Sequence, residues 1–259
     1  MDNHSDFTIH DKREMNKIGL ETYFLDKTNM YDIAIDNLIT DRKTEIRKSQ
    51  EEYDGWDELK EKDPERYNEL VEQADRADIN LDRQQYDYIL DIIYNEEILL
   101  SLIEMKIIYA FKFLEINIKK LLRASFSLKS IKDFYKWDNI TKFLKDKNID
   151  PTVLNGYQEV FQLKNVNNSN KHSDEYETSL KSISEFNTSE RLTYKKLNTF
   201  YERIKSFPDL FFQSLISAIY AELYSFDENK LDAIVESYVL RMKKEDATKL
   251  ANKLLDNYE

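Results

Sequence analysis

The chain has 259 residues, a net charge of −12, no cysteine, and only 3 glycines and 3 prolines. The lack of cysteine excludes disulfides and thiolate metal sites. The acidic balance argues against a general electrostatic attraction to nucleic acid, so any RNA contact needs a local basic patch. So few turn-forming residues argue against a multi-stranded sheet and, with 41% hydrophobic residues, predict an all-α helical bundle.

The N-terminal third is polar and predicted to be mostly helical. Residues 1–26 have a mixed, polar sequence, which indicates a loosely attached arm and no signal peptide. A first helix is predicted from about Met30 to Tyr53, and the charged sequence over residues 41–63 is expected to be solvated. Asp63 and Pro64 have the character of an N-cap and a first helical residue, so they predict a short helix over residues 65–77.

A long apolar helix is predicted from Leu81 to Arg123. Its apolar residues keep a helical period throughout and form a wide stripe, which is typical of a central helix in a bundle. Charged side chains interrupt the region, so it is not a membrane span, and a bend or break is expected near Asn95. Glu115 and Lys119 are spaced for a surface ion pair, with a polar cleft facing Glu115 as the alternative.

The C-terminal half is predicted as further helices separated by short polar segments. Helices are expected over about residues 134–144 and 153–166, the second closed by the polar run 165–173, and a loop over 174–192. A long helix over 192–224 is expected either to kink at Pro208 or to restart there. Two amphipathic segments follow, over residues 231–242 and 246–258.

The polar run contains the most distinctive candidate site. His172 is one of only 3 histidines, and helical geometry places Lys164, Asn168 and His172 at i, i+4 and i+8 on one face. A cation, an amide and an imidazole on one stripe suit a phosphate, although they also suit an ordinary solvated helix end. The sequence contains no glycine-rich phosphate loop, no metal-ligand cluster and no nucleophile elbow, so we expect neither a cofactor nor a bound metal.

The segment from Trp137 to Ser173 resembles the second half of a HEPN domain, a helical family named for higher eukaryotes and prokaryotes nucleotide-binding. Many bacterial members carry a stretch of the form Leu-Arg-x-x-x-Asn-x-x-Lys-His-Ser. This chain matches it in order and spacing, except for a lysine where arginine is usual, at Leu163, Lys164, Asn168, Lys171, His172 and Ser173. The upstream segment around Glu115 is similar to the family's earlier helix, and the resemblance covers roughly residues 85–220.

The resemblance implies a bundle that usually dimerises with its motif helices facing each other. Many members are metal-independent endoribonucleases that serve as toxins or abortive-infection effectors in phage defence, and others are inactive binding or scaffold modules. By this resemblance His172 would transfer protons and Lys164 or Lys171 would stabilise the phosphorane. Asn168 would orient His172 or the phosphate. The remaining candidates, expected to bind substrate, are Lys171, Asn167, Ser173 and Glu115.

The resemblance predicts a cytoplasmic homodimer that acts on RNA, with tRNA as one candidate and an antitoxin-like protein as a further partner. It divides the chain into an N-terminal arm with charged helices (1–84), a HEPN-like bundle (85–225) and a C-terminal helical tail (226–259). Two alternatives stay open. The chain is a catalytically inactive helical interaction subunit of a defence or toxin–antitoxin complex, or it is a helical sensor or ligand-binding bundle. For the motif itself, the non-functional alternative is that Asn168 closes the helix and His172 packs at a surface turn.

Overall fold

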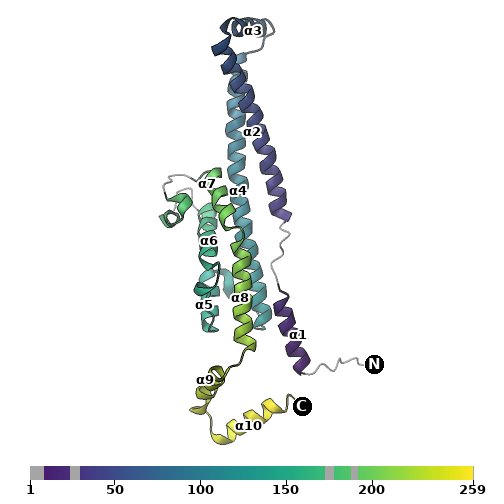
Figure 1. The fold of residues 1–259 in the computed structure, drawn as a ribbon, viewed down its shortest axis with the longest axis vertical. Coiled ribbons are helices and arrows are strands. Elements are labelled where there is room, and N and C mark those ends of the chain that lie inside the picture. The colour runs from purple at the N-terminus through teal and green to yellow at the C-terminus, as the bar shows by residue number, and fades with distance from the viewer. Residues whose placement is uncertain (1–8, 24–29, 173–177, 188–191, 259) are drawn as a thin grey trace, which may run out of the picture. The chain divides into compact units, whose positions relative to one another are not determined.

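In the computed structural model every regular element of the described residues is helical, and those residues contain no strand (Figure 1). This confirms the predicted all-α class. None of the described helices is both long enough and apolar enough to cross a membrane. The structure describes residues 9–23, 30–172, 178–187 and 192–258.

The chain divides into two compact units, called unit 1 and unit 2 below. The division falls inside the helix α4 (Leu81–Ser125), which therefore contributes residues to both units. Of the predicted segment limits, the one after residue 84 lies in the first turns of α4 and the one after residue 225 directly follows α8. Unit 1 is formed by residues 1–25, 114–157 and 209–259, and unit 2 by residues 26–113 and 158–208.

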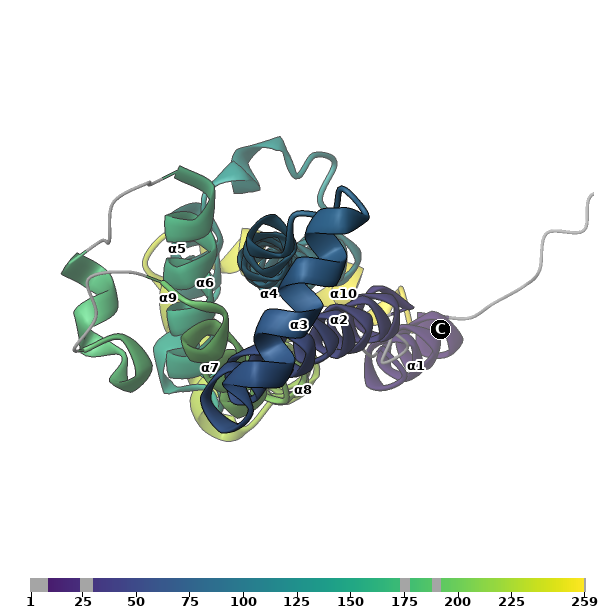
Figure 2. The ribbon, with the colours of Figure 1, turned by 90° about the horizontal axis from the view of Figure 1, so that it is seen from above.

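Unit 2 is built on a pair of long helices. The helix α2 (Met30–Lys62) and the first part of α4 run antiparallel, and α3 (Pro64–Arg76) lies at the turn between them (Figures 1 and 2). Their contact is apolar and includes a tyrosine of α7 (Tyr194–Ile204). The side chains of this cluster are Ile35, Ile39, Leu99 and Leu102, with the partly buried Ile46, Ile98 and Tyr194.

Two features of this pair differ from the sequence prediction. The helix α2 continues to Lys62 instead of ending near Tyr53, because its charged part consists of good helix formers with ion pairs at helical spacing, such as Glu58 with Lys62. The helix α4 does not break at Asn95. The buried Asn95 side chain donates to the Asp91 carbonyl at 2.8 Å and accepts from Arg42 Nη1 at 3.3 Å, so its polar atoms are satisfied within the helix pair.

The predicted cap of α3 is confirmed. Asp63 precedes the helix and its Oδ1 atom accepts a hydrogen bond from the backbone N–H of Arg66 at 3.0 Å, with Pro64 as the first helical residue.

The predicted loop over residues 174–192 is wrong for its described part. Two short 3₁₀ helices, η3 (Thr178–Ser182) and η4 (Ser184–Phe186), bury Leu180, Ile183 and Phe186 completely or nearly so. Each of these helices is about one turn long, and Ile183 between them is extended, with φ −95° and ψ 128°. The segment therefore shows no sustained α-helical period in its sequence.

Unit 1 contains α1 (Ile9–Glu21), the C-terminal part of α4, α5 (Trp137–Asp146), α8 (Phe207–Tyr224) from residue 209 onward, α9 (Glu228–Val239) and α10 (Lys244–Leu255). Instead of the expected loose arm, residues 9–21 form a helix whose Leu20 is buried. The ring of Tyr23 lies 5.9 Å from that of Phe212. Pro208 stands in the first turn of α8, so the helix restarts there, as one of the two alternatives predicted.

Candidate functional site

The predicted motif lies on the last turns of α6 (Tyr157–His172). The apolar face of this helix is fixed by Val160, Leu163 and Val166, all of which are fully buried. Its polar side is braced by Arg203 of α7, whose Nη2 atom donates to Gln162 Oε1 at 3.0 Å. The helix carrying the motif is therefore held in place on two sides.

Arg203 is in turn held by Glu185 of η4. The guanidinium donates to both carboxylate oxygens, from Nε at 2.6 Å and from Nη2 at 3.0 Å. This fork-shaped pair lowers the pKa of Glu185 and raises that of Arg203, chiefly through the hydrogen bonds and against the effect of burial. The pair joins α7 and η4, and through Gln162 it also reaches α6.

Lys164 and Asn168 occupy the stripe predicted for them and are both half-buried. The Lys164 ammonium lies 4.7 Å from the centre of the Phe161 ring, a cation–π distance. Asn168 Oδ1 accepts a hydrogen bond from Asn167 Nδ2 at 3.1 Å, so its amide oxygen is used and its amide nitrogen is the donor end. Lys171 is exposed, while the His172 side chain and Ser173 lie outside the described residues.

The residues between these positions are packed inward. Asn167 and Ser169 are each 1% exposed, although Asn167 is expected from the sequence to contact substrate. Asn167 Oδ1, Ser169 Oγ and both side-chain amide atoms of Asn170 are buried and have no hydrogen-bond partner among the described residues. Most buried polar atoms in proteins are paired, and each unpaired one costs about 1–3 kcal/mol. This arrangement is not that of an ordinary solvated helix end.

Glu115 lies on α4 in unit 1. Its Oε1 atom is 2.8 Å from Lys119 Nζ, and both side chains are largely shielded from solvent. The predicted ion pair of Glu115 with Lys119 is thus present in the structure.

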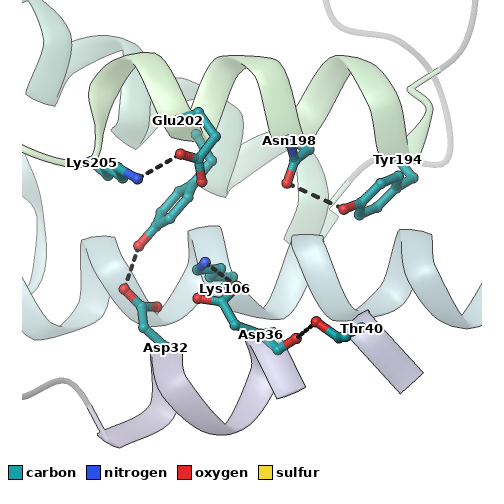
Figure 3. Close-up of polar contacts among 9 residues, drawn as sticks. Asp32, Asp36, Thr40, Lys106, Tyr194, Asn198, Glu202 and Lys205 are labelled. Carbon is teal, nitrogen blue, oxygen red and sulfur yellow. Dashed lines mark hydrogen bonds and ion pairs between the residues drawn. The ribbon is translucent and has the colours of Figure 1, made fainter. Parts of the chain in front are cut away.

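A second polar cluster in unit 2 has no counterpart in the sequence prediction (Figure 3). Lys106 of α4 is only 4% exposed, and its Nζ atom donates to Asp36 Oδ1 of α2 at 2.6 Å. The same ammonium lies 4.8 Å from the ring centre of Tyr201 of α7. The Tyr201 hydroxyl donates a hydrogen bond to Asp32 Oδ2 at 2.8 Å, so the cluster connects α2, α4 and α7.

The electrostatics of this cluster indicate a structural role. Burial raises the pKa of Asp32, and the hydrogen bond from Tyr201 and the charge of Lys106 only partly oppose it. Burial, followed by the charge of Asp32, raises the pKa of Tyr201 far above the ordinary tyrosine value, so its phenol stays protonated. The ammonium is paired and the phenol stays protonated, and we interpret the cluster as a lock between three helices.

The described residues contain no group of three or more histidine, aspartate or glutamate side chains placed to hold a metal ion. No protein-family model, curated protein or solved structure matches the chain. The functional assignment therefore depends on the residues of α6 and their surroundings.

Proposed function

We propose that the chain is a HEPN-like, metal-independent endoribonuclease that acts in the cytoplasm as a toxin or phage-defence effector. The observation that carries the proposal is the set of buried polar atoms on Asn167, Ser169 and Asn170 that lack partners among the described residues. A sequence selected for stability alone would replace such groups with apolar ones. The motif of Asn168, Lys171 and His172 lies on the same turns of the same helix.

The residue types fit cleavage through the ribose 2′-hydroxyl. In that reaction the 2′-oxygen attacks the adjacent phosphorus and the 5′-oxygen leaves, giving a 2′,3′-cyclic phosphate and a 5′-hydroxyl end. A histidine with an ordinary pKa of about 6.5 can accept the first proton and donate the second, which is the role proposed for His172. A cation near the phosphorane oxygens stabilises the charge that develops, which is the role proposed for Lys164.

The hydrogen bond between Asn167 and Asn168 supports a positioning role for the buried amides. Because Asn167 Nδ2 occupies Asn168 Oδ1, the donor end of Asn168 is the part that can meet an acceptor such as a phosphate oxygen. In the proposed homodimer two such sets share one cleft, which concentrates positive charge on a chain that is acidic overall.

The test is RNA cleavage by the purified chain in EDTA, with tRNA and other RNAs as substrates and with detection of cyclic-phosphate ends. We expect His172→Ala to lower the cleavage rate by about 10²–10⁴-fold, the usual contribution of a general acid–base group. The matched control is His10→Ala, which removes an exposed histidine of α1 and should leave cleavage unchanged. Cleavage by His172→Ala at the rate of the original chain would refute the site.

A second candidate is a non-catalytic interaction subunit. It is favoured by an exposed apolar stripe on the first part of α4, where Tyr86, Leu90, Ile93 and Tyr94 face solvent in the described structure. This alternative predicts no cleavage and a stable complex in a pull-down. Overexpression in bacteria separates the two candidates, because only the ribonuclease predicts toxicity that His172→Ala abolishes.

A further inference from the structure

The α9–α10 hairpin exposes a continuous apolar surface. None of the described residues of α9 or α10 is buried. Both helices instead line one groove of about 520 Å³. The large side chains of the groove come mainly from α9. The two alanines that α10 contributes leave more open space on its side of the groove. The groove is lined by Ile234, Val235, Tyr238, Val239, Met242, Lys244, Ala247, Leu250, Ala251 and Leu254.

Helices of this length need a partner to be stable. Isolated helices shorter than about 12–15 residues are marginal in water, and α9 and α10 have 12 residues each. Most helical stability in proteins comes from packing an amphipathic face. The hairpin presents such a face, with apolar residues at the spacing i, i+3, i+4 and i+7 on α9, and the described structure places nothing over it.

We infer that the groove is occupied by the same hairpin of a second copy of the chain, so that two hairpins form an antiparallel four-helix unit. The surface is self-complementary, because the bulky side chains of α9 in one copy can pack against the small Ala247 and Ala251 of the other copy. Such a two-fold contact uses the same patch on both subunits. An engineered cavity of about 150 Å³ holds one benzene molecule, so this groove holds on the order of three large side chains.

The charge of the hairpin favours the same occupant. The whole chain has a net charge of −12, which makes two copies repel each other over most of their surface. Residues 227–258 carry seven acidic and six basic side chains and are therefore nearly neutral. Lys244 is the one charged side chain in the groove lining. A strongly acidic or basic partner would find no matching charge here, whereas a second copy meets no net repulsion.

The experiment is sedimentation equilibrium of the full-length chain at micromolar concentrations. We expect a species of twice the 31.1 kDa chain mass. Val235→Asp places a carboxylate in the groove and should raise the dissociation constant of the dimer at least about 100-fold. The matched control is Val153→Asp, since Val153 is 77% exposed and lies in the 3₁₀ helix η2 (Pro151–Val153), compared with 60% for Val235. The control variant should dimerise like the original chain.

A chemical cross-link distinguishes a dimer through the hairpin from one formed elsewhere, including one through α6. Because the chain has no cysteine, Ala251→Cys introduces a single thiol, and a short bismaleimide should join two copies of that variant. The same treatment of Val153→Cys should leave monomers. A monomeric chain throughout, a dimer that Val235→Asp does not weaken, or no cross-link in the Ala251→Cys dimer would each overturn the inference. None of these outcomes depends on whether the chain cleaves RNA.

Discussion

The last turns of α6 and the α9–α10 hairpin depart from ordinary packing in opposite directions. At α6 the side chains of Asn167 and Ser169 are buried with polar atoms that lack partners among the described residues. On the hairpin, large apolar side chains such as Val235 and Leu254 lie in solvent. The first arrangement costs desolvation energy and the second forgoes hydrophobic stabilisation.

The difference indicates two kinds of missing partner. Buried donors and acceptors are matched by polar groups, as in the recognition or positioning of a nucleic-acid phosphate. An exposed apolar groove is matched by another apolar surface, which we propose is a second copy of the chain. Each variant below alters one of these two regions, or the polar contacts that join helices in unit 2, and its measurement tests whether the difference between the regions persists.

The largest expected effect concerns Lys164, which stands where the motif that this segment resembles has arginine. Lys164→Ala should lower the rate of RNA cleavage by about 10²–10³-fold, because it removes the cation proposed to stabilise the phosphorane. Lys164→Arg should retain or increase the rate, since a guanidinium can grip phosphate oxygens in pairs. Rates measured in EDTA with one RNA substrate compare the variants, and Lys142→Ala serves as a control for the loss of an exposed lysine. Equal rates for Lys164→Ala and the control would remove Lys164 from the site.

The next effect concerns the Lys106 cluster, where Lys106, Tyr201 and Asp32 Oδ2 have partners and Asp32 Oδ1 has none among the described residues. Asp36→Asn removes the carboxylate bound to a lysine that is 4% exposed, and it should lower the free energy of unfolding by about 1–3 kcal/mol. Asp36 itself is largely exposed, which limits the loss. Chemical denaturation at neutral pH measures the change.

Asp32→Asn is the matched control within the same cluster. Burial raises the pKa of Asp32 in the folded state, so its ionised form is disfavoured there, and its contribution to stability falls as the pH rises through the folded pKa. At neutral pH the neutral amide avoids the cost of burying an ionised carboxylate, and its oxygen can still accept the hydrogen bond from the Tyr201 hydroxyl. The free energy of unfolding of the variant should equal that of the original chain or exceed it by up to about 1 kcal/mol. If Asp32→Asn lowered the free energy of unfolding as much as Asp36→Asn, the ionised carboxylate of Asp32 would also stabilise the fold.

A smaller effect is expected from the pair that braces α6. Glu185 has a lowered pKa beside Arg203, so its contribution is present above the unfolded pKa of about 4.3 and is lost as the pH falls through the folded value. Glu185→Gln should therefore reduce the free energy of unfolding by about 1–2 kcal/mol at neutral pH. At a pH below the folded pKa of Glu185, the variant and the original chain should have the same free energy of unfolding. A difference that persists in acid would indicate lost packing rather than lost charge.

The smallest effect is expected on the hairpin. Val239→Lys changes a side chain that is exposed, so in dilute solution it should alter the free energy of unfolding by less than about 0.5 kcal/mol. Thermal unfolding at several protein concentrations gives the check, since a dimer adds stability only at concentrations where it forms. A large loss at the lowest concentration would mean that the hairpin is already packed within one chain.

Much of the helical pattern follows from local sequence, as the α3 cap at Asp63 and the restart at Pro208 illustrate. The Lys106 cluster could not be predicted, because its contacts join residues 70 and 169 positions apart. The core residues of 178–187 could not be predicted from an α-helical period, because they lie in two one-turn 3₁₀ helices and an extended residue between them. On α6 the helical period does place Asn167 four residues after the buried Leu163, so its burial could have been read from the phase of the helix.

The most direct test of the central claim is Ser169→Ala, measured for both thermal stability and RNA cleavage. Alanine removes a buried hydroxyl that has no partner among the described residues and leaves the backbone of α6 unchanged. If α6 keeps these groups for function, the variant should melt at a higher temperature, by the equivalent of about 1 kcal/mol, and cleave RNA more slowly. A lower melting temperature with unchanged cleavage would contradict the account, because it would show that the hydroxyl serves the fold.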